Sequence, residues 1–363
     1  MSQAAGMTVV PTLMTERLTL RALAARDVPE ALAFYRTGRS RFVGGPLDEG
    51  AAWRKLAAYL GHWRLRGDGG WLLEERGTGR AVGFAGVVAW PEKPEPEIGW
   101  MAYEAGEGRG LIAEAVRAAL AHVRDDLGWD RVVSFVAPDN ARSIALAERV
   151  GAVNEGNSPG FTAVHDIPHD CWAHDLSRGV AAKHGEPVAL RDCPTIETGR
   201  LTLRPLALDD HAALAAFWAT EDARFVGGPH DGDVAWRRLA TMLGHWDLRG
   251  FGMFAVDHEG AFVGVVGGWM PPPWPEAEIG WFLFPAARGK GIATEAARAV
   301  RAHAYEHWGW GTALSLIHVD NEPSKRVAER AGARLEATRE FRGEPTEFWR
   351  HPAPHAAKAA SLH

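Results

Sequence analysis

Apolar residues in the second half of the chain recur with a period of two or of about 3.6, which predicts strands and helices in turn. Leu201-Thr202-Leu203 alternates as a strand does, and Asp210 stands at the N-cap of a helix that carries Leu214. The elements predicted next are a helix over 234–245, strands over 252–256, 261–268 and 278–284, a helix from 293, a strand over 313–319 and a helix over 323–331. Helices that interrupt a mostly antiparallel set of strands predict an α+β (α/β three-layer) domain that ends in further strands.

The first half of the chain predicts the same order of elements, because the sequence contains an internal repeat of about half its length. Three motifs return: LGHW (60–63 and 243–246) and FVGGP (42–46 and 225–229) at an offset of 183, and EIGW (97–100 and 278–281) at an offset of 181. The slip falls near EERGTGR (74–80), which predicts a hairpin loop, where a change of length costs least. Solenoid repeats have periods of about 20–50 residues, so this period indicates a duplicated domain.

We therefore predict two domains, at 1–176 and 196–350, joined by a linker over 177–195 and followed by a tail over 351–363. The linker is polar and contains proline and glycine, and the tail is expected to be poorly ordered. A chain of 363 residues that is 46% hydrophobic can supply a core for each domain. Two fused copies could pack as an internal pseudo-dimer, which leaves both a monomer and a homodimer open.

Composition narrows the class of protein. The formal net charge is -6 without acidic or basic blocks, which argues against a nucleic-acid partner bound by bulk charge. Cys171 and Cys193 form no close pair and no metal-ligand spacing with histidines, so we expect no disulfide framework and no metal in the site. No apolar run is long enough to span a bilayer, and the first residues lack the features of a secretory signal, so we expect a soluble cytoplasmic protein without a membrane partner.

A glycine-rich turn follows the predicted strand over 278–284. Its glycines let the backbone approach a ligand, and the helix that follows offers unpaired N–H groups and the positive end of a helix dipole. Arg288 and Lys290 would add positive charge, and the small Ala293 keeps the start of the helix close to a ligand. The turn is therefore suited to bind a pyrophosphate.

This turn resembles the pyrophosphate loop of the GNAT superfamily of N-acetyltransferases, whose pattern Q/R-x-x-G-x-G/A is matched by Arg288, Gly291 and Ala293. Downstream, Asn321-x-x-Ser324 ahead of a helix is similar to the branch that includes the ribosomal-protein N-terminal acetyltransferases. The resemblance covers nearly the whole of each copy and implies two tandem acyl-CoA N-acyltransferase domains that use acetyl-CoA (coenzyme A). The residues that it assigns to the cofactor are Phe282, Leu283, Phe284, Arg288, Gly289, Lys290, Gly291, Ile292, Ala293 and Asn321, although Asn321 could instead cap the turn.

Acylation of an amine needs a neutral acceptor, a stabilised oxyanion and a proton for the leaving thiolate. Glu278 is the candidate general base, through a water, and its alternative is a solvated carboxylate at the start of a strand. Ser324 is the candidate acid, because Ala328 replaces the tyrosine of many relatives, and its alternative is a hydroxyl that satisfies the start of a helix. His245 could bind or deprotonate the acceptor, or be a packed and hydrogen-bonded side chain.

The two copies differ in the turn. Glu107 stands in the first copy where the second has Arg288, and Ile112 stands where the second has Ala293. A carboxylate repels a diphosphate, and a branched side chain crowds the start of the helix. We therefore expect the first copy to bind cofactor poorly and the second copy to hold the working site.

The sequence thus predicts an enzyme that moves an acetyl or short acyl group from acetyl-CoA to a primary amine of a small molecule, a peptide or a protein N-terminus. Two alternatives remain: a non-catalytic acyl-CoA-binding module or sensor, and an aminoacyl transferase of the same fold that uses charged tRNA. The chain has neither G-x-x-x-x-G-K-S/T nor G-x-G-x-x-G, which gives nucleotide hydrolysis and dinucleotide redox chemistry little support.

Overall fold

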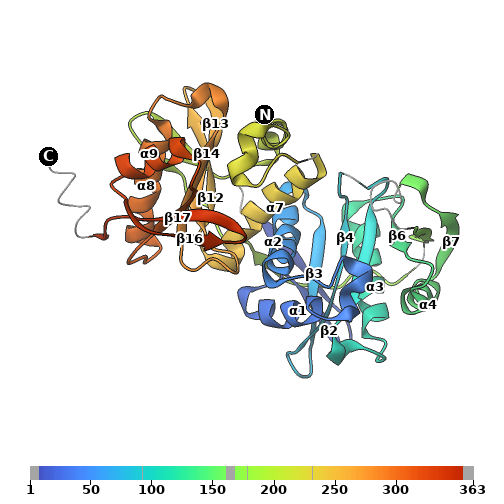
Figure 1. The fold of residues 1–363 in the computed structure, drawn as a ribbon. Helices are drawn as coiled ribbons and strands as arrows, with labels where there is room; N and C mark the ends of the chain where they lie inside the picture. The colour runs from blue at the N-terminus through green and yellow to red at the C-terminus, as the bar shows by residue number, and fades with distance from the viewer. Residues whose placement is uncertain (1–7, 92, 161–167, 178, 231, 355–363) are drawn as a thin grey trace. The chain divides into compact units, whose positions relative to one another are not determined.

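The structure, a computed structural model, describes residues 8–354 apart from 92, 161–167, 178 and 231, and at 232 and 233 it describes the backbone alone. The chain divides into two compact units, Met1–Leu190 (unit 1) and Arg191–His363 (unit 2). Figure 1 labels the helices and strands of both. Within the described ranges, none of the helices is long and apolar enough to cross a membrane.

Unit 2 is built on a sheet with the strand order β10-β11-β12-β13-β14-β15-β17-β16. All neighbouring strands are antiparallel except β14 and β15, which are parallel. The strands are β10 (Ile196–Glu197), β11 (Leu201–Arg204), β12 (Met253–His258), β13 (Ala261–Trp269), β14 (Glu278–Leu283), β15 (Leu314–His318), β16 (Arg334–Phe341) and β17 (Glu344–Arg350). The helices are η5 (Leu208–Asp210), α6 (His211–Trp218), η6 (Glu221–Val226), α7 (Gly232–Arg249), η7 (Pro285–Ala287), α8 (Ile292–His307) and α9 (Glu322–Arg330).

Unit 1 repeats this architecture, with the strand order β7-β8-β6-β5-β4-β3-β2-β1-β9 and one parallel pair, β5 with β6. The strands are β1 (Val9–Met14), β2 (Leu18–Arg21), β3 (Gly69–Glu75), β4 (Ala81–Val88), β5 (Glu97–Ala102), β6 (Val133–Val136), β7 (Ala152–Asn157), β8 (Asp170–His174) and β9 (His184–Ala189). The helices are η1 (Ala25–Asp27), α1 (Val28–Tyr35), η2 (Gly38–Val43), α2 (Glu49–Arg66), η3 (Glu104–Gly106), α3 (Leu111–His122), η4 (Val123–Leu127) and α4 (Ala141–Arg149).

The predicted fold class and order of elements are confirmed in both units. Each unit has a mostly antiparallel sheet with helices between its strands, and each predicted element of unit 2 lies within a few residues of its observed position. The hairpin loop predicted at EERGTGR joins β3 to β4. Asp210 stands at the N-cap of α6 as predicted, but its carboxylate accepts from the N–H of Ala207 at 2.8 Å and pairs with Arg204, and it does not cap the helix.

Part of the predicted linker is a strand. His184–Ala189 forms β9, which runs antiparallel to β1 with Val10 opposite Val188 and completes the edge of the sheet of unit 1. Most of its side chains are exposed, and an exposed edge strand lacks the alternation of apolar residues by which strands are found in a sequence. The boundary between the units falls after Leu190.

The predicted tail also begins later than expected. His351 is buried, and its N–H donates to the carbonyl of Ala313 at 3.0 Å, while the hydroxyl of Tyr305 donates to the carbonyl of Pro352 at 2.9 Å. These residues pack on unit 2, whereas residues 355–363 of the predicted tail lie outside the described residues.

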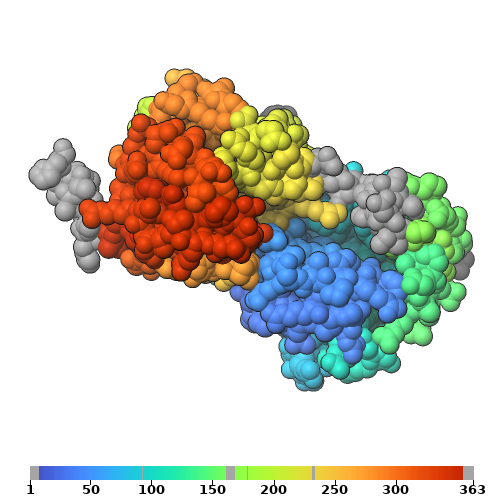
Figure 2. Space-filling model, in the orientation of Figure 1, coloured from blue at the N-terminus to red at the C-terminus, as the bar shows by residue number. Residues whose placement is uncertain are grey.

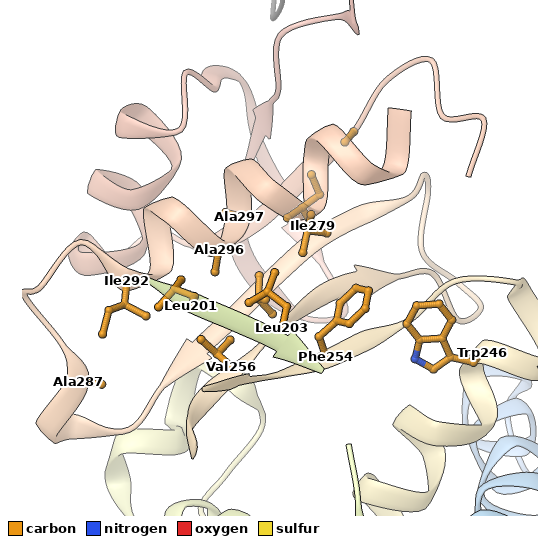
Figure 3. Packing of buried hydrophobic residues seen from close by; sticks show 13 residues of the cluster. Leu201, Leu203, Trp246, Phe254, Val256, Ile279, Ala287, Ile292, Ala296 and Ala297 are labelled. Atoms are coloured by element: carbon orange, nitrogen blue, oxygen red, sulfur yellow. The ribbon is translucent and has the colours of Figure 1, made fainter. Parts of the chain in front are cut away.

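The core of unit 2 lies between α8 and the first strands of the sheet. Figure 3 shows α8 with Ala296 and Ala297 against Leu203 of β11 and Phe254 of β12. Small residues on the buried face of α8 let the helix lie close to the sheet, which fixes the position of the turn that precedes it. Figure 2 shows that side chains fill the spaces between the ribbons of this unit.

Candidate active site

The two parallel strands of unit 2 meet at one point. β14 and β15 pair at Glu278 and Leu314, and no further register pair joins them within the described residues. The hydroxyl of Ser315 donates to the carbonyl of Ile279 at 2.7 Å, just beyond that point. The edge of β14 after Ile279 is therefore open toward β15, where a backbone N–H can meet a ligand.

The side chains of β14 alternate between two faces of the sheet. The ring of Phe282 stacks on that of Phe217 in α6, with centroids 4.9 Å apart and planes 4° apart. Trp281 instead packs against a cluster that includes Ile317 and Ala328, on the side of α9. Glu278 shares the face of Phe282, because residues an even number of positions apart lie on the same side of a strand.

Glu278 is buried, and 9% of its surface is exposed. Its carboxylate accepts hydrogen bonds from the indole N–H of Trp274 and from the N–H of Leu316, the latter at 3.2 Å. Burial raises the pKa of Glu278 to about 7, because desolvation disfavours the charged form and outweighs both hydrogen bonds. The alternative of a solvated strand-start carboxylate is therefore wrong.

The turn after β14 has the backbone conformation that its glycines predict. Gly289 and Gly291 have φ values of 78° and 77°, a left-handed conformation that favours glycine. Gly291 is the N-cap of α8, and no side chain caps this helix start. The N–H groups of the first turn of α8 are therefore available to an anion.

Arg200, just before β11, braces this turn. Its guanidinium donates to the carbonyl of Lys290 at 3.2 Å and pairs with Glu295 in the first turn of α8. The hydroxyl of Thr198 donates to the same carboxylate at 2.7 Å. An open hollow of about 530 Å³ lies beside this brace, lined by Thr198, Gly199, Arg200, Gly291, Thr294, Glu295, Arg298 and Arg330.

Unit 1 keeps both the turn and its brace. Gly108 and Gly110 have φ values of 70° and 73°. The guanidinium of Arg17 donates to the carbonyl of Arg109 at 3.0 Å and pairs with Glu114. The two copies therefore share the backbone of the turn and differ in the charges around it.

In unit 2 the turn carries a surplus of positive charge. Arg288 pairs with Asp222 of η6, and its Nε–H donates to the carbonyl of Leu283 at 3.2 Å. Lys290 forms no ion pair within the described part of the chain. Two cations thus stand against one carboxylate beside the open start of α8.

In unit 1 the ion pair between the same two positions has its charges exchanged. Arg39 of η2, at the position of Asp222, pairs with Glu107 and lies 3.5 Å from Glu104. Arg142 lies 3.4 Å from Glu107. Arg109, at the position of Lys290, pairs with Glu75. Each cation near this turn is therefore matched by a carboxylate.

A second exchange occurs at the candidate base. Glu97, the counterpart of Glu278, forms an ion pair with Lys93, and Lys93 stands at the position of Trp274. The carboxylate of unit 1 is thus held by a cation, whereas that of unit 2 lies against an indole. The two carboxyl groups differ in chemistry although their strands are alike.

Asn321 and Ser324 lie at the start of α9. The side-chain oxygen of Asn321 accepts from the N–H of Ser324 at 3.3 Å, so Asn321 caps the helix. The hydroxyl of Ser324 makes no hydrogen bond within the described residues, so the role of helix-start hydroxyl is taken by Asn321. Both side chains are half-buried.

His245 is a packed side chain. It is fully buried, its Nδ1 lies 2.7 Å from the carbonyl of Phe251, and its Nε2 accepts from the N–H of Met270 at 3.0 Å. Burial lowers the pKa of His245 to about 3. His62 of unit 1 is equally buried and lies 3.1 Å from Asp68. Neither histidine is placed to take a proton from an acceptor.

The FVGGP segment of unit 2 lies at the end of β15. The ring of Phe225 packs on His318 with centroids 5.5 Å apart, and the preceding residues of η6 carry Asp222 to the turn. No motif within a single copy of the sequence points to Asp222, Trp274 or Arg200. Alignment of the two copies could have indicated Asp222 and Trp274, because the equivalent residues of the first copy are Arg39 and Lys93, which have a different charge.

Both copies match the family model described as an acetyltransferase (GNAT) domain, at residues 17–153 and 200–334. The chain therefore belongs to the GNAT family of acetyltransferases, with two such domains in tandem. The predicted resemblance is confirmed, and acetyl-CoA is the cofactor that the family uses. The open edge of β14 and the uncapped start of α8 fit that cofactor.

Several relatives resemble one half of the chain. YdaF of Bacillus subtilis, a candidate ribosomal N-acetyltransferase, is 32% identical over 80 residues, which are 22% of this chain and 44% of YdaF. An acetyltransferase from Agrobacterium tumefaciens C58 is 35% identical, with a TM-score of 0.43, over 48% of this chain and 99% of its own. An acetyltransferase from Salmonella typhimurium that modifies the N-terminal serine of ribosomal protein L7/L12 is 19% identical, with a TM-score of 0.39, over 44% and 98%.

Proposed function

We propose that unit 2 is an N-acyltransferase that moves the acetyl group of acetyl-CoA to a primary amine by direct attack on the thioester. The observation that carries this proposal is Glu278, a buried carboxyl group whose pKa is raised to about 7 on the strand that leads to the cofactor turn. A base with a pKa near the working pH is suited to accept a proton from an ammonium group. The acceptor is an amine of a small molecule, a peptide or a protein N-terminus.

The residues that hold acetyl-CoA follow from the open groups of the site. The N–H groups from Ile292 onward meet the pyrophosphate at the start of α8, and Arg288 and Lys290 supply positive charge. Asn321 follows β15 as the N-cap of α9, and its side-chain N–H groups are the candidate donors to the pantetheine arm. Acetyl-CoA supplies the activated acyl group and a thiolate as the leaving group.

The remaining steps belong to side chains and backbone of unit 2. Glu278 takes a proton from the acceptor through a water, because its carboxylate is already engaged by Trp274 and Leu316. The backbone N–H groups of Trp281 and Leu283, on the edge of β14 that faces away from β13, are placed to polarise the thioester carbonyl. Ser324, whose hydroxyl is not otherwise engaged, donates a proton to the leaving thiolate.

The decisive experiment measures thiol release from acetyl-CoA with a panel of amines that includes ribosomal-protein N-terminal peptides, the class suggested by the name of YdaF. Glu278→Gln is expected to lower kcat/KM by roughly a hundredfold or more while leaving the Kd of acetyl-CoA unchanged. Glu97→Gln in unit 1 is the matched control and should change neither value. If acetyl-CoA binds but no amine stimulates thiol release, the chain is an acyl-CoA-binding module and the proposal fails.

We also propose that unit 1 binds acetyl-CoA weakly. Its turn has the required backbone, but Glu107 occupies the position of Arg288 and the surrounding arginines are already matched by carboxylates. A diphosphate would have to displace these ion pairs to gain their charge. Glu97 is held by Lys93, so unit 1 lacks what Glu278 provides in unit 2, a buried carboxyl group with no ion pair among the described residues.

A further inference from the structure

Three potential metal ligands meet in unit 1, at the end of α3 away from the glycine turn. His122 is the last residue of α3, Asp126 lies in η4, and His184 begins β9. The carboxylate Oδ2 of Asp126 lies 2.7 Å from Nδ1 of His122 and 2.9 Å from Nε2 of His184. One ligand atom of each residue falls within 4.8 Å of the other two. Two imidazoles thus share one carboxylate oxygen.

The local backbone brings these residues together. His122 and Asp126 are four positions apart at the end of a helix, and η4 between them is a turn of π-helix. Turns of π-helix occur frequently at functional sites. α3 has 12 residues and is therefore about 18 Å long, which separates this cluster from the cofactor turn at the other end of the helix.

The segment that carries His184 is fastened to the same turn. The carboxylate of Asp125 accepts from the N–H of Ala182 at 3.0 Å, and His184 is paired with Leu13 of β1 in the sheet. The position of His184 is therefore fixed by the backbone on both sides and does not depend on its contact with Asp126.

The chemistry of the three side chains suits a transition metal. Nε2 of His122 is buried and has no hydrogen-bond partner in the part of the chain that is described, so Nδ1 is the nitrogen that the ring offers. Two imidazoles and one carboxylate are ligands that zinc and other late divalent metals accept.

We propose that Nδ1 of His122, Oδ2 of Asp126 and Nε2 of His184 form a site for one divalent transition-metal ion of the Zn²⁺ class. Ligand atoms around tetrahedral zinc stand about 3.3 Å apart at bonds of about 2.0–2.1 Å, so Oδ2 of Asp126 has to move away from each imidazole nitrogen by about half an ångström. Asp126 and His184 are 35% and 43% exposed and can make that adjustment. A water completes the coordination.

The bound ion would fasten β9 to α3. β9 is the last strand of unit 1 along the chain, and within the described residues only β1 pairs with it in the sheet. A bond through the metal would strengthen the attachment that His184, its first residue, already makes to Asp126. The site is therefore structural, and it holds the segment from which the chain continues into unit 2.

The second copy offers a built-in control. His303 and His307 stand at the positions of His122 and Asp126, and their rings stack with centroids 4.3 Å apart. β9 has no counterpart in the strand order of unit 2 within the described residues. A histidine pair four positions apart can also bind metal adventitiously, so His307→Ala tests for binding there.

The test uses the full chain after treatment with a chelator. Co²⁺ titration followed by visible absorption and Zn²⁺ titration by calorimetry should show one tight site. His184→Ala and Asp126→Asn should each weaken it by roughly a hundredfold, and His307→Ala should leave it unchanged. His184 is exposed, so its variant should fold, which circular dichroism checks. An unchanged affinity in His184→Ala, or loss of the site in His307→Ala, would overturn the proposal.

Amide hydrogen exchange gives an independent readout. Zn²⁺ should slow exchange at the amides of His184–Ala189 in the wild-type chain and not in His184→Ala, because a bound ion suppresses local opening of β9. Exchange that is equally slowed in both chains would show that the ion binds elsewhere.

Discussion

At the scale of single residues, one neighbour decides what a carboxyl group can do. Glu97 and Glu278 begin equivalent strands, but Lys93 pairs with the first and Trp274 donates to the second. The positive charge of Lys93 neutralises the carboxylate of Glu97. The indole of Trp274 donates a hydrogen bond but carries no charge, so the negative charge of Glu278 stays buried without a counter-ion in the described part of the chain. The exchange of Lys93 for Trp274 thus separates a structural carboxylate from a candidate base.

The raised pKa of Glu278 predicts the pH dependence of the reaction. A general base works when it is ionised, so kcat/KM should rise with pH up to about 7 and level off above it, until other groups titrate. Glu278→Gln should remove this limb as well as lower the rate. Values of kcat/KM measured from pH 5 to 9, with an amine acceptor whose own pKa lies outside this range, check the prediction. A rise of kcat/KM up to pH 7 that persists in Glu278→Gln would contradict it.

The same pKa shift predicts a change in stability. The folded-state pKa lies above the ordinary value of 4.5, so ionisation of Glu278 costs free energy of folding, and this cost grows as pH rises from about 4.5 to about 7. Glu278→Gln should therefore raise the Tm at pH 8 more than at pH 5. The corresponding difference in the free energy of unfolding is about 3 kcal/mol at most. Thermal unfolding at both pH values measures it. A Tm change that is equal at both would argue against a buried ionised carboxylate.

At the scale of elements, the backbone conformation of the turn between β14 and α8 is independent of the charges that surround the turn. Both copies keep the left-handed glycines and the arginine brace, so the backbone of the turn does not depend on the residue at position 288. The affinity for an anion does depend on it, because the start of the helix supplies only part of the attraction.

Exchange of the charge at this position should therefore change binding without unfolding the turn. Arg288→Glu is expected to raise the Kd of acetyl-CoA by roughly tenfold to a hundredfold, the value of a charge-assisted hydrogen bond. Glu107→Arg in unit 1 should change binding less, since Arg39 and Arg142 already surround that position. Calorimetry measures both. An unchanged Kd in Arg288→Glu would show that Arg288 is committed to Asp222.

What the sequence could predict at this scale follows from how local each signal is. The order of elements along the chain, the turn at Gly289 and Gly291 and the cap at Asn321 depend on residue types close together in the chain. β9 was missed because its side chains are exposed, and Asp222 because its partner Arg288 lies on a different element. The burial of Glu278 depends on Trp274 and the approach of β15, which no local pattern encodes.

At the scale of the whole molecule, the chain holds two copies of one fold with unequal charge at the same turn. We expect calorimetry to find one acetyl-CoA bound tightly per chain, with any second site at least roughly tenfold weaker. Arg288→Glu should remove the tight site, whereas Glu107→Gln should not. Two sites of equal affinity would contradict the inequality between the units.

The pairing of β9 with β1 also determines where the chain can be divided. A fragment that ends at 176, where the sequence suggests a boundary, lacks β9 and leaves the hydrogen-bonding groups of β1 exposed along one edge. Bare strand edges recruit other chains, so this fragment should aggregate, whereas one that ends at Leu190 should stay monodisperse by light scattering. Equal behaviour of the two would mean that β1 is protected without β9. On this prediction β9, which lies in the segment that joins the two copies, also covers the edge of β1 and prevents unit 1 from self-associating.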